Sequence, residues 1–179
     1  MRNFALLLFA VVALCAIALL PFAFAPRGEY RLSAGAGQST LIPPVDQAAL
    51  LQQRLAVATD ELDVLYAINY AVNHTMTYQP DIDHYGVTEK WVTLPADGRG
   101  DCEDYALSKM ELLRRLGVYM GRMKIGLVVV TLPKDPPAGH AVLEYQMADG
   151  RIAVLDNNFD EIASKEWTEQ HGYSYLSDW

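Results

Sequence analysis

Cysteine is scarce in this sequence of 179 residues, which contains only two, Cys15 and Cys102. Cys15 lies in an apolar N-terminal segment, so the remainder of the chain holds a single thiol and cannot form an internal disulfide. A disulfide framework is therefore excluded as the source of stability. A cysteine without a partner is either buried and inert or a functional thiol, and its neighbours must distinguish the two.

Positive charge is the second shortage. The chain carries 14 Lys and Arg residues against 22 Asp and Glu residues, a formal net charge of −8, and the basic residues form no cluster. Because nucleic acids and anionic lipids are recognised through basic patches, we expect no nucleic-acid partner. An acidic chain of this kind fits an extracytoplasmic protein that binds cations.

The N-terminal segment is a long apolar run. Residues 4–20 are apolar after the basic start at Arg2, and Ala23-Phe24-Ala25 ends the segment. These are the three parts of a secretory signal, so we predict that the protein is exported. Pro26 would follow the cut and disfavours cleavage, and the run is long enough to span a bilayer. Residues 1–25 are therefore predicted to be either a signal peptide or a membrane anchor.

The rest of the chain is predicted to be a linker and one domain. Residues 26–44 are rich in Gly, Ser and Pro, as linkers are. This leaves 45–179, which is long enough for a single domain with its own core. Apolar residues recur at helical spacing over 46–75, as one long helix or as two with a break near Thr59-Asp60. A further helical pattern covers 102–116.

The second half of the domain is predicted to be an antiparallel sheet. Its strands are Lys124–Thr131, His140–Met147 and Arg151–Asp156. Asp149-Gly150 is the hairpin turn between the last two. Helices followed by such a sheet predict an α+β fold. Registering the hairpin about this turn places Asp156 opposite Leu143, so that His140 comes within reach of Asp156 only if the sheet twists or bulges.

The chemistry centres on Cys102, which stands at the first turn of the predicted helix. A thiolate is the attacking form of cysteine, and a helix N-terminus favours an anion. His140 is a candidate base and Asp156 a candidate orienter of its ring. The free backbone N–H of Cys102 suits an oxyanion hole, and Asn73 and Trp91 are candidate side-chain donors.

Three carboxylates surround this thiol. Asp101, Glu103 and Asp104 are expected to raise the pKa of Cys102, because like charges disfavour the thiolate. A bound cation would offset that field, and clustered carboxylate oxygens suit Ca²⁺. The alternative is that Asp101 caps the helix and Asp104 completes a capping pair, with no metal.

Other candidate residues have a more ordinary explanation. His74, His84 and His171 lack a matching motif, so we expect surface or capping roles for them. Asp81 and Asp83 resemble a fragment of a calcium loop, but the spacing to later ligands is wrong for an EF-hand. A simple loop turn is the prediction for these two.

The motifs together resemble a known family. Gly100-Asp101-Cys102-Glu103-Asp104-Tyr105-Ala106, Gly139-His140-Ala141-Val142-Leu143 and Val154-Leu155-Asp156-Asn157 are similar to the bacterial transglutaminase-like cysteine proteinases. The resemblance implies a papain/transglutaminase-like fold with the nucleophile at a helix N-terminus. It further implies that Cys102 is the nucleophile, His140 the general base and Asp156 its orienter. Asp101, Glu103 and Asp104 match the acidic Ca²⁺-ligand positions.

The resemblance also implies a function. It indicates a calcium-dependent periplasmic endopeptidase that acts through a thioester on a protein substrate, in this family a large surface adhesin in biofilm control. An inner-membrane cyclic di-GMP receptor restrains such enzymes and is an implied partner. Two alternatives stay open: acyl transfer or deamidation at glutamine, and a non-catalytic calcium-dependent binding domain.

Overall fold

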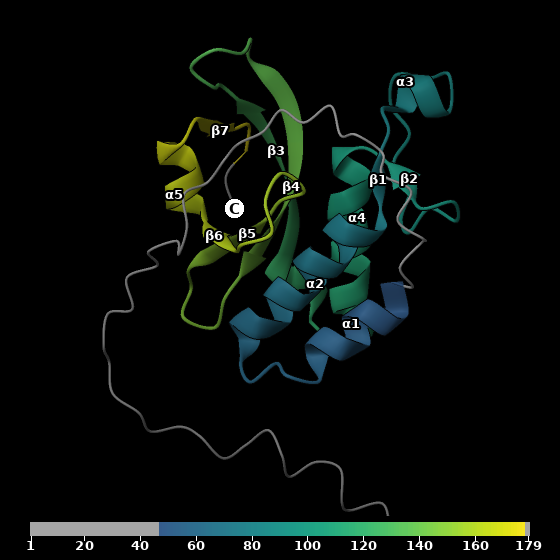
Figure 1. Ribbon diagram of the computed structural model, residues 1–179. Coiled ribbons are helices and arrows are strands. Elements are labelled where there is room, and N and C mark those ends of the chain that lie inside the picture. The colour runs from purple at the N-terminus through teal and green to yellow at the C-terminus, as the bar shows by residue number, and fades with distance from the viewer. Residues whose placement is uncertain (1–46, 178–179) are drawn as a thin grey trace, which may run out of the picture.

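The computed structural model describes residues 47–177, as a helical layer packed against a curled sheet (Figure 1). The predicted signal segment 1–25 and linker 26–44 lie outside this range, as do residues 45, 46, 178 and 179. None of the helices within 47–177 is long and apolar enough to cross a membrane. The predicted α+β class is confirmed.

The helices fall where the apolar spacing predicted them. The N-terminal pattern forms two helices, α1 (Gln47–Leu55) and α2 (Glu61–Thr75), rather than one. Asp60 separates them because its side chain accepts a hydrogen bond from the Asp63 N–H, as an N-cap does. Helix α4 (Cys102–Arg115) begins with the cysteine and is followed by Gly117 in a left-handed conformation, at φ 88°.

The sheet has five antiparallel strands in the order β6-β5-β4-β3-β7. Their bounds are β3 Met123–Val130, β4 Ala138–Gln146, β5 Ile152–Leu155, β6 Ala163–Ser164 and β7 Tyr173–Tyr175. The three predicted strands are present. Strands β6 and β7, and the helices η1 (Met120–Arg122) and α5 (Lys165–Gln170), were not predicted. Each is too short to show a hydrophobic period.

The predicted hairpin register is wrong by one residue. Leu143 is paired with Leu155, not with Asp156. Continuing this ladder would place Asp156 opposite Val142, and Val142 lies two residues from His140. Since residues two apart share a face of a strand, the observed register puts Asp156 and His140 on one face. The predicted register would have put them on opposite faces.

The two faces of the sheet are covered by different helices. Leu143, Tyr145 and Leu155 pack in a core with α2 and α4. Val142 and Val154 pack on the other face, beneath α5 and β7. Figure 1 shows α1, α2 and α4 on one side of the sheet and α5 on the other. Helix α4, which carries the nucleophile candidate, therefore lies on the face of Leu143 and Leu155, whereas His140 shares the strand face of Val142.

A short parallel bridge closes the long loop before α4. Strand β1 (Thr77–Tyr78) pairs with β2 (Arg99–Gly100), and the segment between them contains the short helix α3 (Asp81–His84). Asp81 and Asp83 were predicted to lie in a simple loop turn, and they lie instead in the short helix α3. Because β2 leads directly into α4, the bridge places this loop beside the N-terminus of α4.

Candidate active site and metal centre

Cys102 is the first residue of α4 and is half-buried. The residue before it, Asp101, does not cap the helix: its side chain accepts a hydrogen bond from the Asp81 N–H, at 3.1 Å. Asp104 accepts from the Val92 N–H at 2.6 Å and from the Asp101 N–H, so half of the predicted capping pair exists. Capping alone does not explain these carboxylates.

The thiol is held in its protonated form. Its Sγ donates to Glu103 Oε2 at 3.4 Å, and the Ala141 N–H of β4 is directed at the sulfur. Burial raises the pKa of Cys102 to about 12, and the charge of Glu103 adds to the shift. The predicted repulsion is present, but desolvation is the larger cause. Within 47–177, the thiol makes no hydrogen bond to His140.

His140 and Asp156 form a buried pair. His140 Nε2 lies 2.9 Å from Asp156 Oδ1, and their side chains are 10% and 0% exposed. Asp156 Oδ1 also accepts from the Asn158 N–H, and Oδ2 accepts from the Tyr173 hydroxyl, each at 2.8 Å. Burial works to raise the pKa of Asp156, yet His140 and these hydrogen bonds hold it below its ordinary value. With Nε2 engaged, Nδ1 is the ring nitrogen left for a thiol.

Tyr173 and Asn158 were missed by the sequence analysis. Tyr173 lies in β7, which pairs with β3 and brings the C-terminal segment behind the His140–Asp156 pair. The ring of Tyr173 also meets that of His140 edge-on, with centroids 6.2 Å apart. A three-residue strand leaves no periodic signal, so only the aromatic character of the tail could have drawn attention to it.

The two candidate oxyanion donors are engaged elsewhere. Asn73 Nδ2 donates to the carbonyl oxygens of Asp156 and Phe159, at 2.9 and 3.0 Å, so no donor is left for an oxyanion. The indole N–H of Trp91 donates to Glu89 at 3.3 Å. Tyr78, which was not considered, interacts electrostatically with Cys102: burial and then the charge of Cys102 raise the pKa of its phenol.

An acidic pocket lies at the N-terminus of α4. Asp81, Asp101 and Glu103 each present a carboxylate oxygen, and these oxygens all lie within 4.8 Å of one another. Asp81 is 1% and Glu103 5% exposed. Asp104 is not part of this group. Gly100 permits the close approach of Asp104, since a Cβ there would clash with Asp104 Oδ2.

The carboxylates around α4 are incompletely satisfied. In the part of the chain that the structure describes, four of their buried oxygens have no hydrogen-bond partner: Asp81 Oδ1, Asp101 Oδ1, Glu103 Oε1 and Asp104 Oδ2. Burial raises the pKa of Glu103 to about 7, with the neighbouring Asp101 adding to it, and burial raises the pKa of Asp104 to about 6. Oxygens that lack partners and converge in this way fit Ca²⁺, a hard cation with carboxylate ligands.

Asp81 is the ligand candidate that the sequence analysis assigned to a loop turn. It is separated from Asp101 by 20 positions, and the β1–β2 bridge brings them together. No local spacing signals such a pair. Of the three predicted ligands, Asp101 and Glu103 belong to this carboxylate group and Asp104 does not.

The remaining histidines bond outside this site. His74 lies 2.8 Å from Asp160, His84 lies 2.8 Å from Asp97, and His171 Nδ1 contacts the Trp167 carbonyl at 2.7 Å. They therefore join neither Cys102 nor the acidic pocket.

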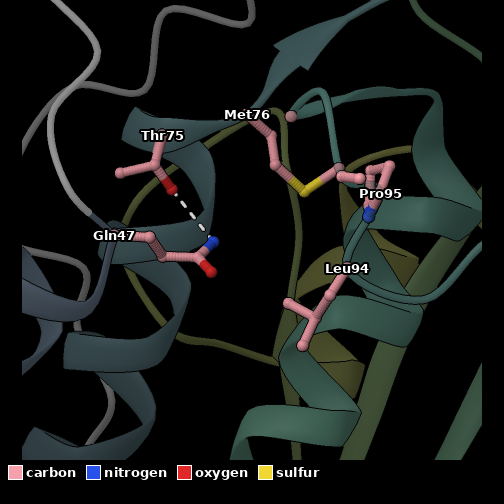
Figure 2. A pocket seen from close by; sticks show the side chains of 7 residues that line it. Gln47, Thr75, Met76, Leu94 and Pro95 are labelled. Carbon is pink, nitrogen blue, oxygen red and sulfur yellow. Dashed lines mark hydrogen bonds between the residues drawn. The ribbon is translucent and has the colours of Figure 1, made fainter.

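A separate hollow lies between the start of α1, the end of α2 and the loop before β2. Figure 2 shows Met76, Leu94 and Pro95 lining one side, with Gln47 hydrogen-bonded to Thr75 at 3.0 Å on the other. Ala96 and Gly98 complete the lining. Because no lining side chain is titratable, this hollow has no acid or base for catalysis.

Comparisons with known proteins agree with this geometry. A family model described as bacterial transglutaminase-like cysteine proteinase matches residues 45–178. The calcium-bound structure of Legionella pneumophila LapG is 17% identical to this chain and has a TM-score of 0.51. The match covers 74% of this chain and 82% of the LapG chain. The structure of EGTA-treated Legionella pneumophila LapG is 18% identical to this chain, with a TM-score of 0.49, and the match covers 75% of this chain and 82% of the LapG chain. No curated protein matches closely enough to count as a relative. The predicted transglutaminase-like peptidase fold is confirmed.

Proposed function

The chain belongs to the bacterial transglutaminase-like cysteine proteinases, and on that premise we propose that it is a calcium-dependent endopeptidase in which Cys102, His140 and Asp156 are catalytic. The observation that carries the proposal is the buried His140–Asp156 pair, 2.9 Å apart, next to a thiol at the start of a helix. The Ala141 N–H directed at the sulfur places the thiol beside the residue that follows His140.

In the proposed acylation, the thiol proton passes to His140 Nδ1 and the thiolate attacks the substrate carbonyl carbon. Asp156 keeps Nε2 protonated and stabilises the imidazolium that forms. The backbone N–H of Cys102 donates to the oxyanion, because the first amide of a helix has no intrahelical acceptor. The imidazolium then gives its proton to the amide nitrogen, the C–N bond breaks, and the amine leaves a thioester on Cys102.

Deacylation reverses the proton transfers with water as nucleophile. His140 takes a proton from the water, whose oxygen attacks the thioester carbonyl. The C–S bond breaks, the sulfur recovers the proton from His140, and a carboxylic acid is released. An amine that replaced water would give acyl transfer instead, which is the alternative reaction of this fold.

Asp81, Asp101 and Glu103 are the residues that would hold Ca²⁺. The ion supplies positive charge beside the thiol, which counters the field that raises the pKa of Cys102. Glu103 accepts a hydrogen bond from the thiol, and as a metal ligand it would no longer be available to do so. The thiol would then be free to turn toward His140.

Exposed apolar side chains around the site support a polypeptide substrate. Tyr78, Ile82, Val87 and Trp91 are 56%, 55%, 45% and 48% exposed. They come from β1, α3 and the loop that follows, which borders the N-terminus of α4. Exposed apolar side chains on elements that border the N-terminus of α4 suit a peptide better than a small polar ligand.

We extend the proposal to a periplasmic enzyme that cleaves a large surface adhesin and is restrained by an inner-membrane cyclic di-GMP receptor. This extension rests on the family resemblance of the sequence motifs. The predicted signal segment 1–25 is consistent with export, either cleaved or retained as an anchor.

The test is alkylation of the full chain by iodoacetamide as a function of pH, with mass spectrometry to separate Cys102 from Cys15. In Ca²⁺ the acid dissociation constant of the Cys102 thiol is expected to be at least about a hundredfold larger than in EGTA, so that its apparent pKa is lower. Mg²⁺ should not substitute for Ca²⁺. Hydrolysis of p-nitrophenyl acetate should accompany this reactivity and vanish in Cys102→Ala. A thiol that stays unreactive in Ca²⁺ would instead support the non-catalytic binding domain.

A further inference from the structure

Tyr173 contacts both members of the His140–Asp156 pair, and the proposed reaction does not yet use it. Its hydroxyl donates to Asp156 Oδ2 at 2.8 Å, and its ring meets the His140 ring edge-on with centroids 6.2 Å apart. The side chain is 3% exposed, so both contacts are shielded from bulk water. A buried phenol needs a hydrogen-bond partner, and the partner here is the residue proposed to orient the catalytic histidine.

The fold brings Tyr173 to this pair from the edge of the sheet. Strand β7 is an edge strand, and β3 and β4 separate it from β5, which Asp156 follows directly. Tyr173 is paired with Val130 and Val130 with Ala138. Ala138 lies two residues from His140 on β4. Because paired residues share a face of a sheet, as do residues two apart on a strand, Tyr173 lies on the same face as His140.

Strand β7 is held in place by contacts that the Tyr173 side chain does not make. Gly172, at φ 97°, forms the turn into the strand, and a Cβ there would clash with the Thr131 carbonyl oxygen. At the other end of the strand, the Tyr175 hydroxyl lies 2.9 Å from the Thr168 hydroxyl of α5. Tyr173 therefore extends from a strand that is fixed on both sides of it.

The two oxygens of Asp156 have different partners. Oδ1 lies 2.9 Å from His140 Nε2 and also accepts a hydrogen bond from the Asn158 N–H. In the described range 47–177, the donor to Oδ2 is the Tyr173 hydroxyl. Without this hydroxyl, Oδ2 would be a buried acceptor that lacks a partner, which is costly. The carboxylate would then gain by turning so that both oxygens share the remaining donors, and Oδ1 would move from His140 Nε2.

We infer that Tyr173 is a positioning residue, whose hydroxyl holds Oδ2 of Asp156 so that Oδ1 stays on His140 Nε2 throughout the reaction. The inference rests on the proposed roles of His140 and Asp156, and it adds the residue that fixes the orientation of the carboxylate. The edge-on ring of Tyr173 limits the tilt of the imidazole from the same side.

A phenol suits this role because it donates without carrying charge. Burial, and then the charge of Asp156, raise the pKa of Tyr173 above its ordinary value, so the hydroxyl keeps its proton at neutral pH. A neutral donor fixes the direction of the carboxylate and leaves its negative charge to stabilise the His140 imidazolium. A cation at the same place would offset part of that charge.

The direct test follows the proton on His140 Nε2 by NMR in full-chain protein with ¹⁵N-labelled histidine, with the signal assigned by its loss in His140→Gln. Tyr173→Phe keeps the ring and removes only the hydroxyl. The His140 proton is then expected to exchange with water at least about tenfold faster, because its acceptor is no longer fixed by a hydrogen bond. Tyr175→Phe removes a hydroxyl from the same strand and is the matched control, which should leave the exchange rate unchanged. An unchanged rate in Tyr173→Phe, or equal changes in both variants, would overturn the inference.

A second variant does not depend on the stability of Tyr173→Phe. 4-Aminophenylalanine incorporated at position 173 keeps the shape of the ring and a hydrogen-bond donor in the same place, so no buried acceptor loses its partner. An aniline donates more weakly than a phenol, so the exchange rate of the His140 proton is expected to lie between those of wild type and Tyr173→Phe. If Tyr173→Phe does not fold, a wild-type exchange rate in this variant contradicts the inference.

The functional consequence is tested by p-nitrophenyl acetate hydrolysis in Ca²⁺. Tyr173→Phe is expected to lower kcat by about tenfold with KM within about twofold, whereas Tyr175→Phe should change neither. If Tyr173 acts through Asp156, Tyr173→Phe should add little to the loss in Asp156→Asn, and additive losses would overturn the inference. A wild-type protein without hydrolysis would instead count against the proposed function, and the His140 proton would still decide the role of Tyr173.

Discussion

Two groups of buried carboxylates flank Cys102, and they differ in how their oxygens are satisfied. Asp156 receives a hydrogen bond on both oxygens and has a lowered pKa. The acidic pocket of Asp81, Asp101 and Glu103 has an oxygen on each residue without a partner, and the pKa of Glu103 is raised to about 7. Both groups are buried, so burial does not explain the difference.

The difference teaches which part of the site the chain completes by itself. Around Asp156, a histidine, a tyrosine and a backbone N–H supply the donors. Around the acidic pocket, the chain supplies a donor to only one oxygen of each carboxylate, and buried acceptors without donors are rare in native proteins. The first group is finished on folding, and the second is complementary to a cation.

The largest loss of activity is expected when Asp156, whose oxygens are both hydrogen-bonded, is replaced. Asp156→Asn removes the negative charge that stabilises the His140 imidazolium and should lower p-nitrophenyl acetate hydrolysis in Ca²⁺ by about 10³-fold. The fold should be retained, because both side-chain atoms can still meet Tyr173 and Asn158. Asp149→Asn in the exposed hairpin turn is the control. Wild-type hydrolysis by Asp156→Asn would mean that another residue orients His140.

In the absence of metal, the acidic pocket should make the free energy of unfolding depend on pH. The pKa of Glu103 rises from 4.5 to about 7 on folding, so the folded state binds more protons over that range. The free energy of unfolding should therefore fall as pH rises from about 5 to 7.5, on the order of 2 kcal/mol in EGTA. Urea unfolding measures it.

Two further samples sharpen this result. Ca²⁺ should remove the decline, since the bound ion favours the ionised carboxylates. Glu103→Gln should flatten it without any metal. A decline that is the same in EGTA, in Ca²⁺ and in Glu103→Gln would show that other groups cause it.

A smaller effect separates two neighbouring aspartates on α3. Asp81→Asn should weaken Ca²⁺ binding by about tenfold or more, measured by calorimetry, because it removes one charge from the pocket. Asp83 is exposed on the same helical turn, so Asp83→Asn should leave the affinity within about twofold. Equal effects of the two variants would exclude Asp81 as a ligand.

The smallest effect is expected at the surface side of the Asp156 turn. His74→Gln breaks the pair with Asp160, whose side chains are 45% and 33% exposed. Exposed pairs contribute little, so the free energy of unfolding should fall by less than about 1 kcal/mol. Ester hydrolysis should not change. A large loss of hydrolysis would show that Asp160, and not Asp156 alone, supports the site.

Much of this arrangement could be predicted from the sequence. Periodicity identified α4 and the strands β3, β4 and β5, and the motif around Cys102 identified the start of the helix. His140 and Asp156 were paired correctly even though the hairpin register was wrong. A one-residue register is set by packing of both sheet faces, and a turn motif alone does not determine it.

The remainder depended on contacts between distant segments. Asp81 reaches Asp101 through a two-residue bridge, and Tyr173 reaches Asp156 through a three-residue strand. Asn73 was one of two candidate oxyanion donors because its amide suits that role, but its N–H groups hold the turn that carries Asp156.

The β1–β2 bridge has a consequence for the strength of cation binding. It joins the two ends of a loop of about 20 residues, and closing such a loop costs on the order of 3 kcal/mol of chain entropy. That entropy is lost when the protein folds, not when the ion arrives. The backbone N–H of Asp81 donates to the Asp101 carboxylate, and the Asp81 carboxylate accepts from the Lys90 N–H. Asp81 is therefore held in position by the folded loop. A cation held by Asp81, Asp101 and Glu103 would therefore meet a loop that is already ordered, and its affinity would depend on the two residue pairs of the β1–β2 bridge.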